Sequence, residues 1–284
     1  MTTLSSPSHR TGPTGPPRSA GSRVARTAPT GGGLTGAIAS EWTKLWSVRT
    51  TWWALLASVL LMAATAGQLA IYAANANTND DPADDPGVVG VGRIVIDSME
   101  LTQYAVLAVA LLVITSEYAT GTIRATLQWT PSRTKMLLAK ATVVGAVTFP
   151  VGLLLGVVGT VVARPVLGKW GTMPVGETVG DIAAVAAYLT LIGVFTLGLG
   201  AALRSAVLTL TILFLSLMII PLSLQEPDIP VLTWIADLFP GVAGAHFMRG
   251  DTDPYPPVVG LLLLTGWAMV ALFAGRLVLR RRDA

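Results

Sequence analysis

Long apolar runs separated by short polar segments dominate this chain. Most of the runs contain about 20 residues, the length that a helix rising 1.5 Å per residue needs to cross about 30 Å of hydrocarbon. The second run is the shortest. The pattern therefore predicts an all-α polytopic membrane protein with six transmembrane helices, at residues 53–74, 99–115, 139–162, 182–203, 206–224 and 258–279.

An amphipathic segment precedes the first run. Between residues 34 and 49, apolar residues recur at helical spacing and alternate with charged neighbours. Tryptophan on one side and cations on the other suit the headgroup region of a bilayer. We expect an interfacial elbow helix here, with the frayed start of the first span as the alternative. Its characteristic residues are Glu41, Trp42, Lys44, Leu45 and Arg49.

The first 33 residues are rich in Ser, Thr, Pro, Gly and Arg and contain no hydrophobic run. Such a composition cannot bury enough apolar surface to offset the entropy lost on ordering. It also lacks the apolar core of a signal peptide, so no cleavage is predicted. We expect a disordered tail at 1–33 and a six-helix membrane domain at 34–284.

Positive charges between the runs predict the orientation. If both termini face the cytoplasm, all of the 19 Lys and Arg residues except Arg93, Arg164, Lys169 and Arg249 fall inside. Cytoplasmic enrichment of Lys and Arg sets topology, so the pattern favours an N-in, C-in protein of a bacterial cytoplasmic membrane. The acidic residues 80, 81, 84 and 85 then lie in the first outer loop, where a solvated loop explains them better than a calcium site.

The apolar runs contain no charged residue near their centres. Ion-coupled transporters carry ionisable groups there, so a secondary transporter is disfavoured. The sequence has no cysteine, only His9 and His246, and no phosphate-binding loop or catalytic motif. We therefore expect no catalytic, cofactor-binding or metal-ligating residue in this chain. Energy for any pumping has to come from another protein.

Glycines recur in the third and fourth runs. Gly152 and Gly156 form a G-x-x-x-G pattern, and Gly193, Gly198 and Gly200 follow in the next run. Small residues let helix backbones approach closely in lipid. We expect close packing inside the molecule, with a subunit interface or a substrate path as the alternatives.

An interrupted apolar stretch lies before the last run. Residues 231–247 are apolar but broken by glycine, and non-helical backbone at membrane depth has to be shielded by protein or water. We expect a re-entrant or interfacial outer segment that lines an exit, around Phe239, Pro240, Gly241 and Gly244. His246 is interpreted as an interfacial polar residue.

The segment after the second run reads Ser-Glu-Tyr-Ala-Thr-Gly-Thr-Ile-Arg-Ala-Thr-Leu at 116–127, followed by Thr-Pro-Ser-Arg at 130–133 and Leu-Leu-Ala-Lys at 137–140. This resembles the type-2 ABC-transporter permeases, particularly their actinobacterial branch, in which a span ends in Glu-Tyr/Phe-x-x-Gly-Thr-Ile-Arg. The Glu-Trp-x-Lys-Leu opening at 41–45 and the Phe-Pro-Gly-Val-Ala-Gly stretch at 239–244 resemble the elbow helix and outer segment of the same family.

The resemblance implies a six-helix permease that works with a separate ATP-binding-cassette subunit, which would hold ATP and magnesium, and with a second permease copy in a homodimer or heterodimer. It also implies a short cytoplasmic coupling helix that docks on the ATPase. We assign the coupling role to Glu117, Tyr118, Thr120, Gly121, Thr122, Ile123 and Arg124.

Glu117 has three candidate partners in this picture. It could hold the elbow helix through Lys44 or Arg49, or it could contact Arg124 in its own loop. Gly121 would permit a backbone bend after the span. The alternative is that these polar residues only anchor a loop at headgroup level.

The sequence therefore predicts the membrane subunit of an ATP-driven exporter, with no enzyme activity of its own, membrane lipids as its surroundings and no nucleic-acid partner. Apolar spans with few polar groups suit a hydrophobic or amphipathic cargo such as a drug, an antibiotic or a lipid. The alternative is a membrane anchor or assembly protein that transports nothing.

Overall fold

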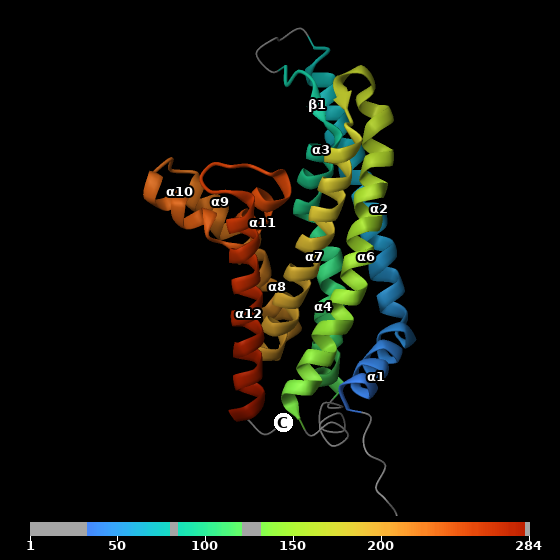
Figure 1. Cartoon of the computed structure of the whole chain (residues 1–284), viewed down its shortest axis with the longest axis vertical. Helices are drawn as coiled ribbons and strands as arrows, with labels where there is room; N and C mark the ends of the chain where they lie inside the picture. Colours follow the sequence, from blue (N-terminus) through green and yellow to red (C-terminus); the bar gives the residue numbers. More distant parts are fainter. Residues whose placement is uncertain (1–32, 80–84, 121–131, 282–284) are drawn as a thin grey trace, which may run out of the picture. The chain divides into compact units, whose positions relative to one another are not determined.

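The computed structural model describes residues 33–79, 85–120 and 132–281. Within these ranges, five helices are long and apolar enough to cross a membrane. They are α2 (Arg49–Ala76), α6 (Arg133–Leu167), α7 (Val175–Leu203), the composite helix Ala206–Gln225 and α12 (Pro257–Arg281). Each contains one of the predicted runs, so the chain is an all-α membrane protein (Figure 1).

The second predicted run corresponds to a bent pair of helices. Helix α3 (Val91–Asp97) and helix α4 (Met99–Thr120) meet at an angle of 52°, and the apolar part of the pair ends at Thr115. At the bend, the Ser98 hydroxyl donates to the carbonyl of Ile94 and so satisfies an acceptor at the end of α3. A second bent pair follows later in the chain. The number of spans in the described residues is thus five to seven, depending on how the two pairs are counted.

Helix α7 lies at the centre of the packing and is the most buried of the apolar helices. It packs against α12, α6 and α4. The glycines explain two of these approaches: a Cβ added at Gly152 of α6 would lie 2.5 Å from the Ala186 backbone of α7, and one at Gly198 would lie 2.5 Å from the Ala271 backbone of α12. The predicted close packing within the molecule is confirmed at these positions.

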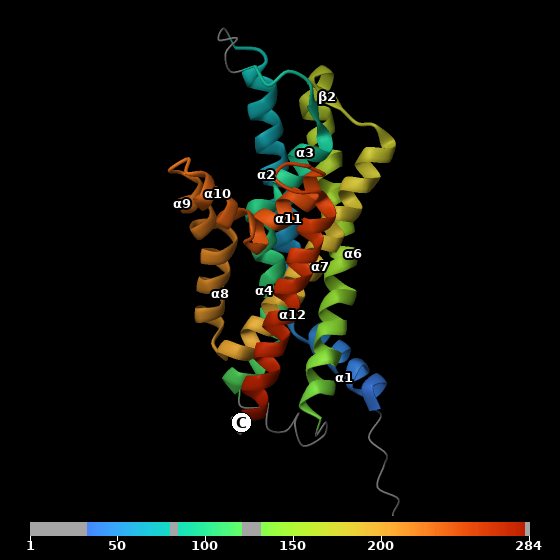
Figure 2. The same ribbon diagram turned by 60° about the vertical axis from the view of Figure 1, so that its left-hand side comes forward.

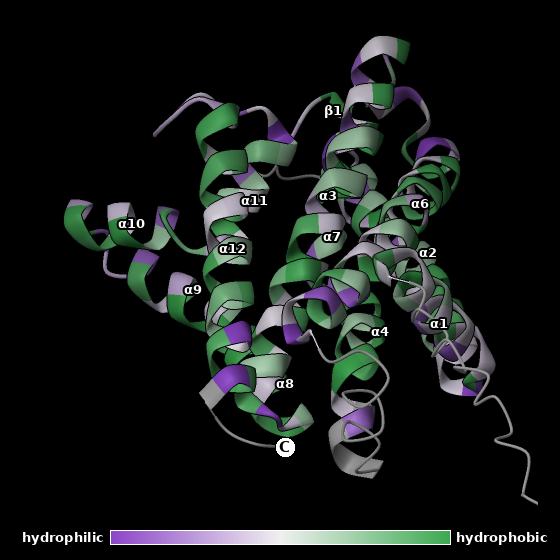
Figure 3. Ribbon diagram, turned by 60° about the horizontal axis from the view of Figure 1, so that its bottom comes forward, coloured by the Kyte–Doolittle hydropathy of each residue, from purple (hydrophilic) through white to green (hydrophobic). Residues whose placement is uncertain are grey.

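Helix α6 is longer than a bilayer requires. Its 35 residues extend about 52 Å at 1.5 Å per residue, against about 30 Å of hydrocarbon. A short parallel pairing of β1 (Val89–Gly90) with β2 (Gly171–Thr172) lies beyond its C-terminal end, next to the one-turn 3₁₀ helix Gly168–Trp170. The sequence pattern did not predict this two-residue pairing. Hydrophilic residues gather near helix ends, whereas apolar residues follow the lengths of α4, α7 and α12 (Figure 3).

The composite helix contains a local change of pitch. Helix α8 (Ala206–Phe214) passes through a π-helical turn, Leu215–Ile219, into α9 (Ile220–Gln225). Pro221 is the second residue after the turn, and proline cannot donate the hydrogen bond of a regular α-helix. The π turn is the form that the irregularity near Pro221 takes.

The segment before α12, which the sequence predicts to be an outer segment, is helical. Helix α10 (Pro230–Asp237) and helix α11 (Pro240–Arg249) are bent by 80° at Leu238 and Phe239. The expectation that Gly241 and Gly244 break this stretch was wrong. Both glycines lie inside α11, and the break precedes Pro240, which is favoured in the first turn of a helix.

One residue, Val48, separates the N-terminal helix α1 (Gly33–Ser47) from α2. Helix α1 lies beside the N-terminal part of α6 (Figure 2). A separate helix is therefore present where the elbow was predicted. The predicted tail was 1–33; its last residue, Gly33, begins α1, and residues 1–32 lie outside the described residues. So do Asp80, Asp81 and Asp84 of the acidic cluster and the loop 121–131.

Candidate functional site

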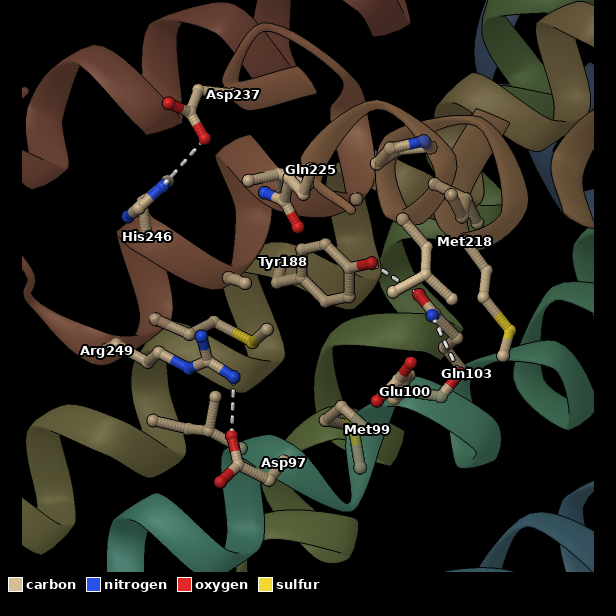
Figure 4. Close-up of a pocket in the computed structure, with 18 of the residues that line it drawn as sticks. Asp97, Met99, Glu100, Gln103, Tyr188, Met218, Gln225, Asp237, His246 and Arg249 are labelled. Carbon is tan, nitrogen blue, oxygen red and sulfur yellow. Dashed lines mark hydrogen bonds and ion pairs between the residues drawn. The ribbon is translucent and has the colours of Figure 1, made fainter. Parts of the chain in front are cut away.

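An open pocket of about 450 Å³ lies between the two bent pairs and the π-helical turn (Figure 4). Helices α3 and α4 contribute one wall, α9, α10 and α11 contribute others, and Tyr188 of α7 lies between them. A volume of this size is typical of sites for small molecules. The outer segment that the sequence singled out does line a pocket, which Gly241 of α11 borders directly.

A buried hydrogen-bonded chain lies along one side of the pocket. The Tyr188 hydroxyl donates to the side-chain oxygen of Gln103, and the Gln103 amide donates to the carbonyl of Glu100 at 3.0 Å. Tyr188 and Gln103 are 2 % and 4 % exposed. Because burying these polar groups without partners would cost free energy, the chain fixes both side chains and gives the pocket a polar edge.

Helix α11 approaches this region closely because two of its residues lack side chains. A Cβ at Gly241 would collide with the carbonyl group of Leu217 in the π turn, and a Cβ at Gly244 would collide with the ring of Tyr188. The two glycines therefore bring α11 against the other pocket walls. This role replaces the helix-breaking role that the sequence suggested.

Charged groups surround the pocket. Arg249 at the end of α11 donates to Asp97 at the end of α3 over 2.7 Å, and Arg93 lies 3.5 Å from the other Asp97 oxygen. His246 Nε2 lies 3.6 Å from the Asp237 carboxylate. The Tyr255 hydroxyl donates to the Asp237 carbonyl at 2.5 Å; burial, together with the charge of Asp237, raises the pKa of Tyr255 to about 12.

A second charged cluster lies at the other end of α4. The Lys140 side chain of α6 is fully buried, and its ammonium group contacts Glu41 of α1 at 2.5 Å, Glu117 of α4 at 3.0 Å and the Val113 carbonyl at 3.0 Å. Three acceptors match the three donors of an ammonium group. This arrangement meets the requirement that a buried charge be paired and hydrogen-bonded.

Lys44 completes this cluster from the solvent side. Its ammonium group lies 2.7 Å from Glu41 and 2.9 Å from Glu117. Burial alone would raise the pKa of Glu117, but the charges of Lys140 and Lys44 outweigh burial and hold the pKa below its usual value. Burial lowers the pKa of Lys44, yet its bonds to Glu41 and Glu117 raise the pKa overall. We call Glu41, Lys44, Glu117 and Lys140 the charge quartet.

The quartet agrees with one of the three partnerships predicted for Glu117, the one with Lys44. Arg49, the second candidate, is an exposed residue at the start of α2. Arg124, the third, lies outside the described residues, as do Gly121, Thr122 and Ile123. Tyr118 and Thr120 belong to the last turn of α4, so the helix continues past the predicted end of the span.

The predicted elbow residues divide between two faces of α1. Glu41 and Leu45 are buried, with Leu45 packed in an apolar cluster with Val109 of α4 and Val143 of α6. Trp42 is 42 % exposed and stacks edge-on against Trp46. This division is what an amphipathic helix at a membrane border requires.

Sequence reasoning missed the central residue of the quartet. In the sequence, Lys140 counts only as one of the cytoplasmic charges, although it lies seven positions after the start of α6 and its side chain is buried. Apolar residues flank it at Ala139 and Ala141. That context was a signal that the lysine faces protein, but its partners lie 99 and 23 positions away in the sequence. No feature of the sequence around Tyr188 or Gln103 indicated that these residues line a pocket.

The two sites share helix α4. Glu100 and Gln103 border the pocket, and Glu117 belongs to the quartet. The 17 positions between Glu100 and Glu117 correspond to about 25 Å of α-helix. Comparison of the sequence with protein-family models and with curated proteins found no match.

Proposed function

We propose that this chain is the permease subunit of an ATP-binding-cassette exporter, with six transmembrane spans and both termini in the cytoplasm of a bacterium. The observation that carries the proposal is the placement of α4. One continuous helix borders a ligand-sized pocket at its start and joins the charge quartet near its end, and the predicted coupling loop follows it directly.

The pocket supports a transport role. It combines hydrophobic side chains with polar and charged ones, and it lies where two helix pairs are bent rather than straight. Bent and broken helices are common at the binding sites of membrane transporters, because the breaks provide polar backbone and hinge points. An amphipathic cargo suits such a lining.

The quartet supports a mechanical link. It fastens α1 to the end of α4 and to α6 through charged groups that are largely removed from water. Breaking such a buried pair by removing one partner is costly, so the three helices act as one body. A force applied to the loop after α4 by a separate ATPase would therefore move α1 and α6 together with α4.

The proposed partners are an ATP-binding-cassette ATPase, which holds ATP and magnesium, and a second permease copy. In this arrangement α3 and α4 form one broken span, and α10 and α11 form a re-entrant outer segment. The chain itself carries out no chemical reaction. Its site of action is the bacterial cytoplasmic membrane.

A membrane anchor that transports nothing is the second candidate. A protein of that kind has no need of a ligand-sized pocket bordered by a helix that leads to a coupling loop. The two candidates differ in one measurable property: only a permease supports ATP-dependent movement of a solute.

Inside-out vesicles from the native host test the proposal. ATP-dependent accumulation of lipophilic dyes would be compared between the wild-type chain, a deletion strain and the Glu117→Gln variant, with Glu177→Gln at the far end of α7 as the matched carboxylate control. We expect accumulation in wild type and Glu177→Gln, and its loss in the deletion strain and in Glu117→Gln with expression unchanged. Full accumulation in Glu117→Gln would remove Glu117 from the coupling role, and no difference on deletion across a broad set of dyes would favour the anchor.

A further inference from the structure

We infer that the pocket between the bent helix pairs binds amphipathic organic cations. This inference names the ligand class of the proposed transport site and therefore rests on the proposed function for its biological meaning. The binding itself requires only the described residues of this chain.

The charge balance around the pocket favours a cation. Four carboxylates line it, those of Asp97, Glu100, Asp237 and Asp253, against the single guanidinium of Arg249. Arg249 is already bonded to Asp97 over 2.7 Å. The other three carboxylates form no ion pair with Lys or Arg among the described residues, so the pocket carries an excess of negative charge.

Asp237 contributes most to this excess because it is removed from water. The residue is 5 % exposed, and the nearest basic group in the described chain is His246 Nε2 at 3.6 Å, beyond a good hydrogen bond. A buried carboxylate without a close cation is costly. A ligand cation that enters the pocket would supply the missing charge.

His246 offers a second buried polar atom on the same wall. Its Nδ1 is buried and has no hydrogen-bond partner in the described structure. In the neutral imidazole that carries its proton on Nε2, the side nearer Asp237, the Nδ1 atom is a hydrogen-bond acceptor. An N–H group of a ligand would satisfy this atom, which favours protonated or aromatic amines over quaternary ions.

The pocket lining also includes apolar and polarisable side chains. Met99, Met218 and Met248 border the pocket, together with Leu217 and the Tyr188 ring. Methionine side chains are flexible and polarisable, and surfaces rich in them accept ligands of different shapes. An aromatic ring also attracts cations to its face. The pocket therefore suits a flat, lipophilic body that carries a positive amine.

Two dyes of nearly the same size and shape provide the test. Rhodamine 123 is a xanthene methyl ester with a delocalised positive charge and N–H groups, whereas fluorescein methyl ester carries oxygen at the same positions and is an anion in mildly alkaline buffer. Binding of each dye to the purified full chain in phosphatidylcholine nanodiscs would be followed by fluorescence anisotropy, with empty nanodiscs subtracted.

We expect rhodamine 123 to bind at least about tenfold more tightly than the anionic analogue, because the carboxylates attract one dye and repel the other. Asp237→Asn should weaken rhodamine 123 binding by about tenfold, and Glu100→Gln, at an exposed position, by about threefold. Glu226→Gln is the matched control, since this exposed carboxylate at the end of α9 does not line the pocket.

Equal affinity for the two dyes would overturn the inference. Wild-type affinity for rhodamine 123 in both Glu100→Gln and the double variant Glu100→Gln/Asp253→Asn would also overturn it. Both positions are exposed, so we expect these variants to fold even if Asp237→Asn does not. Since no ATPase is present, selective binding without ATP-driven transport would contradict the proposed function alone, and ATP-driven transport without selective binding would contradict this inference alone.

Discussion

The ammonium group of Lys140 lies 2.5 Å from Glu41, 99 positions earlier in the chain, and the lysine side chain has no exposed surface. This contact joins the N-terminal helix to the longest helix of the molecule. The second carboxylate of the quartet, Glu117, comes from a third helix. A single buried cation thus connects α1, α4 and α6 at one end of the membrane domain.

Removing that cation should destabilise the protein. In Lys140→Met, the Glu41 and Glu117 carboxylates would lose the buried ammonium group, and the Val113 carbonyl would lose its donor. Breaking a buried pair from one side typically costs about 3–5 kcal/mol, which corresponds to about 10 °C in Tm for a chain of this size. Thermal unfolding of the purified variant measures the loss.

Lys135→Met is the control for this change, because Lys135 lies on the same helix but is exposed. We expect its Tm to stay within about 2 °C of wild type, as is usual for surface substitutions. If the two variants unfolded at the same temperature, the quartet would not be holding the three helices together.

The acid side of the stability profile should depend on Glu117. Its pKa is below 4.5 in the folded protein, so the stability that it contributes is fully present above pH 4.5 and is lost as the pH falls through the folded pKa. Lys44 has a raised pKa, so its contribution is present below 10.5 and is lost only as the pH rises above that value. Between these limits the contributions of Glu117 and Lys44 should be insensitive to pH.

The difference in Tm between wild type and Glu117→Gln reports this dependence. We expect a constant difference from about pH 8 to about pH 5 and a shrinking one in more acidic buffer, where Glu117 takes up a proton in wild type. A difference that stayed the same down to about pH 3 would mean that the charge of Glu117 contributes nothing to stability.

Gly241 should tolerate no side chain. The position of a Cβ there is occupied by the carbonyl group of Leu217, which is backbone in the π turn and has little freedom to move. We expect Gly241→Ala to destabilise the protein by about 1–3 kcal/mol through overpacking and to alter the pocket. Gly266→Ala in α12 is the control, since a Cβ at Gly266 meets nothing within 4 Å. If Gly241→Ala and Gly266→Ala unfolded at the same temperature, α11 would not approach the π turn as closely as described.

The orientation of the helices can be tested by labelling introduced cysteines, because the chain has no cysteine of its own that would react. Thr172→Cys and Thr252→Cys lie at the end that the charge pattern places outside, and Ser47→Cys lies at the other end; all three positions are exposed. In intact cells, a membrane-impermeant maleimide should label the first two, and Ser47→Cys only after the cells are opened. Labelling of Ser47→Cys in intact cells would reverse the predicted orientation.

Element positions were the most predictable part of the fold. An apolar run long enough to cross a bilayer has one stable solution, a helix, since no water is present to satisfy the backbone. The runs at 182–203 and 258–279 accordingly lie within α7 and α12. The bends were harder to predict, because the 52° angle after α3 and the 80° angle after α10 depend on packing between distant segments.

The candidate site was only partly predictable for the same reason. Glu117 and Lys44 stand out locally as charged residues at the border of an apolar run, and their contact was among the alternatives. The pocket combines residues of α3, α4, α7 and the segment from the π turn to α11. The positions of Gln103 and Tyr188 in the sequence do not indicate that their side chains form a hydrogen bond. The role of Gly241 likewise depends on a partner, Leu217, whose position comes from the tertiary fold.

Co-purification tests the central claim most directly. The full chain, tagged at its C-terminus and expressed in its native host, would be purified in mild detergent, and the proteins that accompany it would be quantified by mass spectrometry alongside the Glu117→Gln variant. The account predicts a near-stoichiometric ATP-binding-cassette ATPase in the wild-type sample. An intact, folded chain that purifies without any ATPase, under conditions that preserve other transporter complexes of the same host, would contradict the account.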